Sequence, residues 1–335
     1  MTNDPLLYDF KLPLRAVFYP LGFPLEIRTN SKEVLEAAQE SWGQFKQGYA
    51  EKPLQIHIAV QGSASGECPS TLERRGQRNL VIRVADTANF TISDQQAGFS
   101  YGWLSPALIE NRGWFRYEFL EAMAWDLLHS FYLTPIHAAC VRMAECGVLL
   151  CGDSGAGKSS LAYACAREEW KFLSDDACCL VRKLNTRTVV GNPYQIRFRD
   201  SAVELFPELK NREITRRAGG KLSIELPTSG IPGIKTITES SVDYIVFLKR
   251  GEFDPPRMVP IASKAAGDWF HQVINWGPRK MRKEQSGSLG QLLEAPTFEL
   301  QYSDLGAAVA KLETLVRNDH RADAVRALAE SCEHA

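Results

Sequence analysis

The stretch Gly147–Ala166, GVLLCGDSGAGKSSLAYACA, decides the fold of this chain. Its apolar first part is typical of a buried strand, which ends in a glycine-rich turn followed by Lys158, two serines and small helix-forming residues. The pattern Gly-x-x-x-x-Gly-Lys-Ser/Thr between a strand and a helix is that of a phosphate-binding loop, or P-loop. A chance glycine-rich turn is the alternative, and the match of both motif and context argues against it.

Each part of this loop has a physical reason to bind phosphate. Glycines permit unusual φ angles and a close approach of the backbone, and successive backbone N–H groups around Gly155–Lys158 can point at phosphate oxygens. The helix N-terminus adds positive potential. Lys158 can neutralise the β- and γ-phosphates, and the Ser159 hydroxyl can ligate Mg²⁺. We therefore expect ATP and Mg²⁺ as cofactors. The nucleotide-binding residues expected from the loop are Gly152, Asp153, Ser154, Gly155, Ala156, Gly157, Lys158, Ser159 and Ser160.

Two adjacent acids, Asp175 and Asp176, follow the loop at the point where a second strand is expected to end. A carboxylate there can hold Mg²⁺ or accept the proton of an attacking hydroxyl. Neighbours along a strand point to opposite faces, so only one of the two acids is expected to face the terminal phosphate directly. A solvated turn remains the alternative interpretation of Ser174–Asp176.

His137 lies on the strand that precedes the loop. A lone histidine in an apolar strand is usually a satisfied core residue. By itself it therefore supports no functional assignment.

The order of these features resembles the catalytic domain of HPr kinase/phosphorylase, a relative of the ATP-using phosphoenolpyruvate carboxykinases. That family has a histidine, a strand–turn–strand, the loop G-D-S-G-x-G-K-S, a helix and a pair of acids. Here the stretches are IHAACVRMAECGVLLCGDSGAGKSS (Ile136–Ser160) and KFLSDDACCL (Lys171–Leu180), with matching spacings. The resemblance is specific over Ile136–Val181 and is not visible in residues 1–130.

The resemblance implies an α/β fold with a mixed sheet, built around a P-loop kinase core of the HPr kinase/phosphoenolpyruvate carboxykinase type. It implies that Asp175 is the catalytic base and that Asp176 is the second acid near the metal, which Ser159 also binds. It further implies an active-site role for His137, with Lys158 in its usual place. Arg197 matches an arginine of the family and is expected to reach phosphate.

The chain departs from the family at one metal ligand and at one later segment. Gln195 stands where the family has a metal-binding glutamate, and a glutamine supplies no charge. Asp200 or Glu204 is left open as a substitute. The proline- and arginine-rich segment of the phosphorylase reaction is not recognisable. The nearest basic residues are Arg217 and Lys221.

With 335 residues, the chain is long enough for about two domains. The prediction is an N-terminal α+β region over residues 1–133, which could recognise the acceptor, and a catalytic domain over residues 134–335. The secondary structure expected at the two ends is strands within 14–29, 53–60 and 79–104, a loop over 62–77, and helices over 31–45, 114–133, 303–318 and 321–334. The basic stretch 276–283 is expected to be a solvated loop.

Composition narrows the class of protein. The apolar fraction is 44% and the charged fraction 24%, as in ordinary globular proteins. A net charge of −1 argues against a dedicated nucleic-acid binder. No apolar run approaches the ~20 residues that span a bilayer, so no membrane partner is expected. The start of the chain carries acids and prolines rather than a signal-peptide pattern, and most of the eight cysteines lie in apolar stretches, as in a reduced, cytoplasmic protein.

The sequence thus predicts an ATP-dependent kinase that transfers the γ-phosphate to a hydroxyl, most simply a serine of a protein or peptide. Two alternatives stay open: a kinase for a small hydroxyl compound, and a nucleotide-dependent binding or assembly protein that has lost transfer. Gln195 favours the binding protein, whereas Lys158, Asp175 and Asp176 favour the kinase. The acceptor, phosphorolysis and a homo-oligomeric state are left open.

Overall fold

The computed structural model describes residues 11–62, 68–182, 186–216, 222–274 and 277–318. By its contacts the chain divides into two compact units. Unit 1 comprises Met1–Leu133 and Trp276–Arg282, and unit 2 comprises Thr134–Asn275 and Lys283–Ala335. The roles assigned to residues 1–133 and 134–335 stay predictions, because a division by contacts says nothing about function.

Unit 1 is built on a seven-stranded mixed sheet in the order β1-β2-β3-β7-β6-β5-β4. Strands β2, β3 and β7 run parallel, and the remaining pairs are antiparallel. Alternation of buried and half-buried residues along the strands shows that the two faces of the sheet differ. The strands are β1 (Leu14–Phe18), β2 (Leu25–Thr29), β3 (Leu54–Val60), β4 (Glu73–Gln77), β5 (Leu80–Asp86), β6 (Asn89–Asp94) and β7 (Phe99–Leu104).

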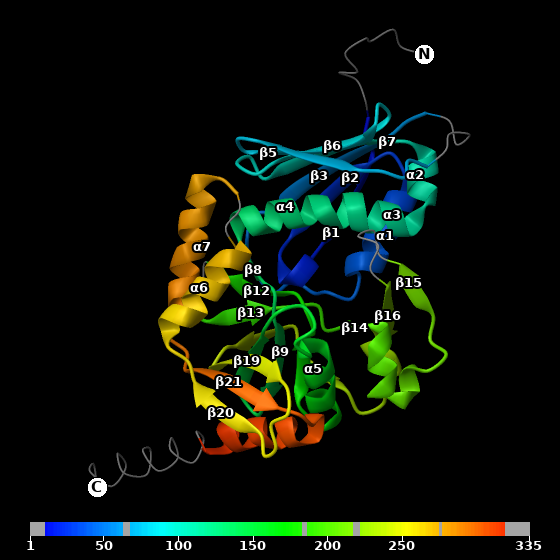
Figure 1. The fold of residues 1–335 in the computed structure, drawn as a ribbon. Coiled ribbons are helices and arrows are strands. Elements are labelled where there is room, and N and C mark those ends of the chain that lie inside the picture. Colours follow the sequence, from blue (N-terminus) through cyan, green and yellow to red (C-terminus); the bar gives the residue numbers. More distant parts are fainter. Residues whose placement is uncertain (1–10, 63–67, 183–185, 217–221, 275–276, 319–335) are drawn as a thin grey trace, which may run out of the picture. The chain divides into compact units, whose positions relative to one another are not determined.

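Helices cover the inner face of this sheet. Helix α1 (Lys32–Trp42) contacts β1 and β2, and α4 (Glu121–Phe131) runs along the sheet against β3, β6 and β7 (Figure 1). Short elements α2 (Pro106–Glu110), α3 (Arg112–Trp114) and the π-helical turn 115–120 lead into α4. The apolar stripe of this helix is completely buried, as its four-residue repeat predicts. Its members are Phe115, Phe119, Met123 and Leu127.

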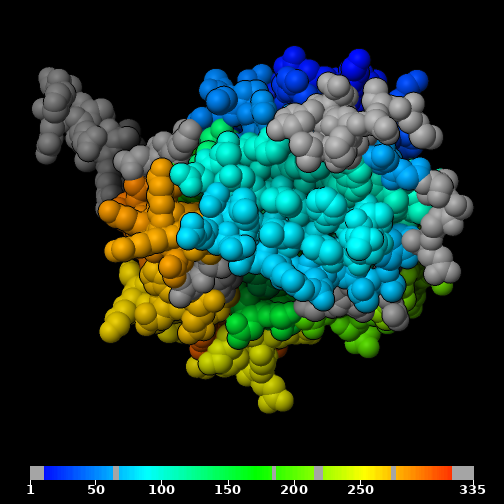
Figure 2. Space-filling view, turned by 90° about the horizontal axis from the view of Figure 1, so that it is seen from above, coloured from blue at the N-terminus to red at the C-terminus, as the bar shows by residue number. Residues whose placement is uncertain are grey.

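The outer face of the sheet carries half-buried apolar and aromatic side chains. Phe90 pairs with Trp103 across β6 and β7, and Ile92 pairs with Tyr101. Figure 2 looks down on this face, where the residues coloured cyan belong mainly to β5, β6 and β7. Single half-exposed apolar residues are ordinary on a protein surface, and helix α4 packs along the opposite face of the sheet.

A buried ion pair joins α4 to the sheet in unit 1. Arg83 on β5 donates from both terminal nitrogens to the Asp126 carboxylate, with Nη2 at 3.0 Å from Oδ1. Arg83 is 5% and Asp126 2% exposed. The exposed Arg74 adds a longer contact of 3.4 Å to Oδ1 of the same carboxylate. Two buried charges of this kind are stable only while both are present.

Removing one partner tests this dependence. We expect Arg83→Met to lower the free energy of unfolding by about 3–5 kcal/mol, because Asp126 would remain buried without a counter-charge. Arg74→Met, which removes an exposed contact to the same carboxylate, should cost about 0–1 kcal/mol. Urea denaturation of both variants measures the difference. Equal losses would mean that the buried pair is not what fastens α4 to the sheet.

Unit 2 is built on a second seven-stranded mixed sheet, in the order β17-β11-β9-β10-β19-β21-β20. Strand β10 runs parallel to β19 and antiparallel to β9, so the phosphate-binding loop leaves from the middle of the sheet. The strands are β9 (Ala139–Met143), β10 (Cys146–Cys151), β11 (Lys171–Ser174), β17 (Lys235–Thr236), β19 (Tyr244–Arg250), β20 (Arg257–Pro260) and β21 (Thr297–Tyr302).

Both faces of this sheet are covered, which explains why β10 reads as one continuous apolar run. Val148 and Leu150 pack with α5 (Lys158–Arg167) and the helix over residues 305–318 in one core. Leu149 and Cys151 pack on the opposite side, in a core that includes side chains of α6 (Ser263–Ile274) and α7 (Arg279–Leu292).

Two smaller sheets complete unit 2. A four-stranded sheet has the order β18-β13-β12-β8, from β8 (Leu133–Ile136), β12 (Cys178–Val181), β13 (Thr188–Val190) and β18 (Glu239–Ser241). A three-stranded sheet has the order β14-β16-β15, from β14 (Gln195–Phe198), β15 (Ile214–Arg216) and β16 (Leu222–Pro227). Strand β14 also packs on α5, and so the three-stranded sheet stands beside the phosphate-binding loop.

The predicted mixed α/β class is confirmed, with corrections in detail. The loop predicted over 62–77 is wrong at its end, because residues 73–77 pair with β5 as the edge strand β4. The basic stretch predicted as a solvated loop instead begins α7 at Arg279. The helix predicted over 321–334 lies outside the described residues. Along the described parts of the chain, every helix is too short or too polar to cross a bilayer.

Candidate functional site

The phosphate-binding loop connects β10 to α5 and is shaped by three glycines with positive φ angles. These angles are 142° at Gly152, 99° at Gly155 and 95° at Gly157. A side chain at Gly157 would also collide with the Tyr302 hydroxyl, since its Cβ would lie 2.6 Å away. That hydroxyl donates a hydrogen bond to the Ala156 carbonyl at 3.3 Å. The buried Tyr302 side chain therefore holds the loop in place at Ala156 and Gly157.

Lys158 is the first residue of α5, and its ammonium lies inside the loop. Nζ donates to the Gly152 carbonyl at 2.7 Å and to the Asp153 carbonyl at 3.3 Å. Burial lowers the pKa of this lysine, while the nearby Asp176 carboxylate opposes the shift. A partly desolvated ammonium held by two carbonyls is well placed to exchange them for phosphate oxygens, which are stronger acceptors because they are charged.

Asp175 follows β11 and is buried, with 6% of its surface exposed. Its Oδ2 accepts the backbone N–H of Arg197 at 2.9 Å, and its own carbonyl accepts the Ser159 hydroxyl at 3.4 Å. Burial raises the pKa of Asp175 to about 6, and the neighbouring Asp176 charge adds to the rise. A carboxylate with this pKa is a stronger base than an exposed aspartate and is still ionised near neutral pH.

A bulge in β11 determines which way Asp175 points. Pairing with β9 shifts by one residue between Phe172 and Ser174. As a result Leu173 and Ser174 lie on the same side, where both face Gly191, whose Cβ would come within 2.4 Å and 2.7 Å of them. Asp175 follows directly, and its carboxylate accepts the Arg197 N–H and lines the same cavity as Lys158 and Ser159 of α5.

Asp176 pairs with His137 instead of sharing the environment of Asp175. Nδ1 of His137 lies 3.1 Å from Oδ1 of Asp176, and both side chains are about two-fifths exposed. His137 thus lies beside the second acid, and its active-site role stays a prediction. The pair carries a formal charge on the imidazole only when His137 is protonated.

These groups line one cavity of about 310 Å³. Its lining brings together most of the residues expected from the sequence with several that the sequence did not indicate. The expected members are His137, Ser154, Gly155, Gly157, Lys158, Ser159, Ser160, Asp175, Asp176 and Arg197, with Glu204 among the candidates left open. The additional members are Phe198, Arg199, Ser201, Ala202, Leu205, Leu222, Ser223 and Arg250.

Three expected loop residues do not belong to this lining. The Gly152 and Ala156 positions form the back of the loop, where a Gly152 Cβ would meet the Ala156 Cβ at 2.9 Å. The Asp153 side chain accepts a hydrogen bond from the Trp269 indole at 3.3 Å. Arg217 and Lys221 lie outside the described residues.

Gln195 and Arg197 share a carboxylate that the sequence did not indicate. Gln195 Nε2 donates to Glu225 at 2.7 Å, and the Arg197 side chain lies 3.3 Å from the same carboxylate and 3.1 Å from the Gln195 carbonyl oxygen. The cause is the pairing of β14 with β16, which places Arg197 opposite Glu225. Of the two substitutes left open for the missing glutamate, Glu204 reaches the cavity, and Asp200 is not in its lining.

The donor set fits a divalent cation held jointly with a phosphate. Across the described residues, no group of three or more histidine, cysteine, aspartate and glutamate side chains could hold a metal unaided. Mg²⁺, however, usually takes one or two protein oxygens and completes its shell with phosphate oxygens and water. The Ser159 hydroxyl and the Asp176 carboxylate both line the cavity, and they are the two oxygens expected from the sequence to bind Mg²⁺.

The site therefore consists of a P-loop with acidic and cationic side chains in the same cavity lining. No protein-family model matches the chain, and none of the curated proteins matches it. Among solved structures, the chain is similar to the Hpr(Ser) kinase/phosphatase from Coxiella burnetii, at 17% sequence identity and a TM-score of 0.31. That similarity covers 56% of this chain and 97% of the other. A likeness this distant leaves the family of the chain open.

The burial of Asp175 predicts that it lowers stability as the pH rises. Its pKa is about 6 in the folded protein and near 3.8 when exposed, so the folded state holds the extra proton between these values. Stability should fall over this range and then level off. We expect Asp175→Asn to be more stable than wild type by about 1 kcal/mol near pH 4.5 and by about 3 kcal/mol above pH 7.

Denaturant unfolding across this pH range measures the difference. Asp200→Asn, at an exposed carboxylate nearby, is the control and should change stability little at any pH. A stability gain for Asp175→Asn that did not vary with pH would show that the carboxyl titrates normally.

Proposed function

We propose that this protein is an ATP-dependent kinase that transfers the γ-phosphate of ATP to a hydroxyl acceptor. The observation that supports this most strongly is one cavity holding the P-loop, its lysine and a buried carboxylate whose pKa is raised to about 6. A phosphate-binding loop alone serves binding as well as transfer. A buried base beside it is useful only if a proton has to be removed.

The groups that line the cavity have separate parts in the proposed reaction. The loop N–H groups and Lys158 would hold the phosphates, and the Ser159 hydroxyl and Asp176 would hold Mg²⁺, which would neutralise phosphate charge. Asp175 accepts the proton of the acceptor hydroxyl. The hydroxyl oxygen forms a bond to the γ-phosphorus, the bond from that phosphorus to the bridging oxygen breaks, and ADP leaves with the bonding pair. The protonated Asp175 then returns its proton to solvent.

The acceptor we propose is a serine of a protein or peptide, with a small hydroxyl compound as the alternative. The lining of the cavity mixes charged groups with the apolar side chains of Leu205 and Leu222. A protein segment can lay one serine into such a cavity while the rest of it stays outside. The N-terminal unit could contribute recognition, as proposed from the sequence.

A second reading is a nucleotide-dependent binding or assembly protein without transfer. The observation in its favour is that Gln195 hydrogen-bonds to Glu225 and is not in the cavity lining. The carboxylate that the resembling family uses for its metal is therefore not supplied at this position. The retained pair Asp175 and Asp176 favours transfer.

Lys158→Ala tests the nucleotide site. Removing the ammonium leaves phosphate charge uncompensated, so the affinity for ATP–Mg²⁺ should fall by at least about tenfold, as expected for loss of a charged hydrogen bond. Isothermal titration calorimetry measures it. Lys249→Ala, at an exposed lysine paired with Glu299, should bind ATP as the wild type does. The proposal fails if the wild-type protein binds no nucleotide.

Asp175→Asn separates a kinase from a binding protein. With γ-labelled ATP and host-cell extract, transfer should fall by about 10²–10⁴ while ATP affinity stays within a few-fold, because binding needs no base. Wild-type transfer should rise as the pH passes about 6, where Asp175 ionises. Asp176→Asn should be rescued in part by higher Mg²⁺. Unchanged transfer by Asp175→Asn would rule out its role as base.

A further inference from the structure

Three arginines line the cavity: Arg197, Arg199 and Arg250. The first two differ in the groups that they contact. Arg197 is ion-paired with Glu225 and hydrogen-bonded to Gln195. Arg199, two residues further along, reaches across to the phosphate-binding loop, where Nη2 donates to the Ser154 hydroxyl at 2.6 Å. Among the described residues, no carboxylate forms an ion pair with Arg199. Its charge is thus available to a ligand, whereas that of Arg197 is already matched.

The Arg199 guanidinium lies directly against the loop. Its Nη1 is 3.4 Å from the position that a Cβ on Gly155 would occupy, and Cζ follows at 3.9 Å. Gly155 itself has a φ of 99°, a conformation that favours glycine. A second cation therefore lies against the loop at Ser154 and Gly155, in addition to the Lys158 ammonium at the Gly152 and Asp153 carbonyls.

The backbone that carries Arg199 is fixed by the core. Phe198 is buried and packs against Tyr163 of α5, with ring centroids 5.1 Å apart. One residue earlier, the backbone N–H of Arg197 is bound to the Asp175 carboxylate. Arg199 itself is extended and precedes the 3-10 helix at Asp200–Glu204. The side chain is exposed, and its backbone lies two residues from the N–H that binds the Asp175 carboxylate.

We infer that Arg199 recognises the terminal phosphate of a nucleoside triphosphate, which its guanidinium binds in place of the Ser154 hydroxyl. The inference rests on the proposed nucleotide-binding function. An arginine offers two parallel N–H donors to a phosphate and stays charged at every physiological pH. In that position Arg199 neutralises charge on the equatorial oxygens as the γ-phosphorus passes from ADP to the acceptor, and it gains or loses no proton itself.

This placement makes a distinct claim about nucleotide selection. A diphosphate occupies the loop and Lys158 but does not extend to Arg199, so only a triphosphate gains the extra contact. The protein should therefore prefer a triphosphate over a diphosphate, and the preference should depend on Arg199. A purely structural role, in which Arg199 only steadies the loop through Ser154, would affect both nucleotides alike.

The test is calorimetric titration of the full-length protein with AMP-PNP–Mg²⁺ and with ADP–Mg²⁺. We expect Arg199→Gln to weaken AMP-PNP binding by about 10- to 100-fold, the usual worth of a charged hydrogen bond, and ADP binding by no more than about threefold. Arg199→Lys should recover part of the affinity. Ser154→Ala should keep the preference for AMP-PNP, because the guanidinium leaves that hydroxyl on binding.

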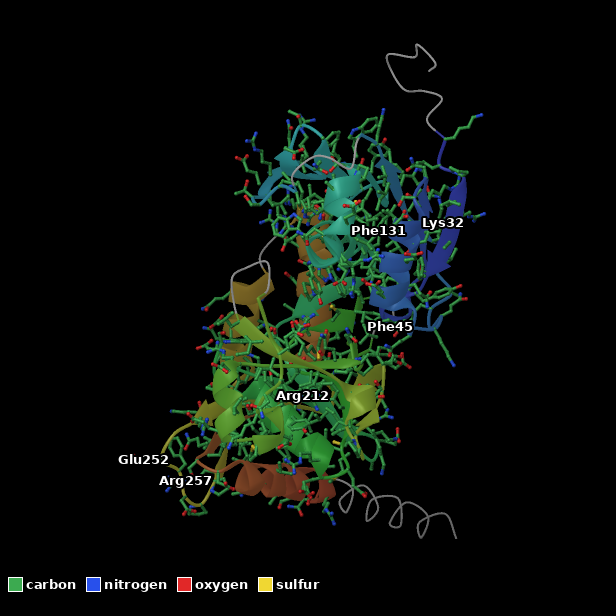
Figure 3. All side chains as sticks on the ribbon, turned by 90° about the vertical axis from the view of Figure 1, so that its right-hand side faces the viewer. Lys32, Phe45, Phe131, Arg212, Glu252 and Arg257 are labelled. Atoms are coloured by element: carbon green, nitrogen blue, oxygen red, sulfur yellow. The ribbon has the colours of Figure 1, made fainter. Side chains whose placement is uncertain are left out.

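Arg257→Gln is the matched control. Arg257 begins β20, outside the cavity lining, and it is labelled in Figure 3. It should bind both nucleotides as the wild type does. If wild-type protein binds AMP-PNP and ADP, and Arg199→Gln keeps the same preference or Ser154→Ala loses it equally, the inference on Arg199 is overturned and the nucleotide site stands. If the wild type binds neither nucleotide, the proposed function itself fails.

Discussion

One hydrogen bond links the parts of the candidate site: the backbone N–H of Arg197 donates to the Asp175 carboxylate. It connects the three-stranded sheet to the end of β11, and through the Asp175 carbonyl to Ser159 at the start of α5. This donor helps to offset the desolvation of a carboxylate that is buried to this degree. The bond also holds the backbone of β14 at Arg197. Arg197 and Arg199, which flank Phe198, are both carried by this segment.

The loop and its flanking elements follow from sequence because their signals are local. A continuous apolar strand, a glycine-rich turn and a helix start within twenty residues, and the pattern alone predicts their order. The stripe from Phe115 to Leu127 is equally local, and its burial is complete. Local periodicity therefore accounts for most of unit 1 and for the central part of unit 2.

The remainder of the site depends on pairings between distant segments. Glu225 faces Arg197 only because β16 lies beside β14. The sequence of either segment alone does not predict this pairing. Arg199 contacts Ser154 across 45 residues of chain. Arg250 reaches the cavity because β19 runs parallel to β10 and ends at the same edge of the sheet. Sequence reasoning named Arg197 and passed over the other two arginines for this reason.

The bulge in β11 has a consequence for comparing this chain with others. Counting in steps of two from Phe172 would turn Asp175 away from α5, whereas the one-residue shift turns it toward α5. In a chain with the same Asp-Asp pair and a regular strand before it, the second acid would take that inward place. Which of the two aspartates takes the place of the base thus depends on the register of the strand that precedes them. Two aspartates that align in sequence are therefore equivalent only when both chains also have the bulge in the preceding strand.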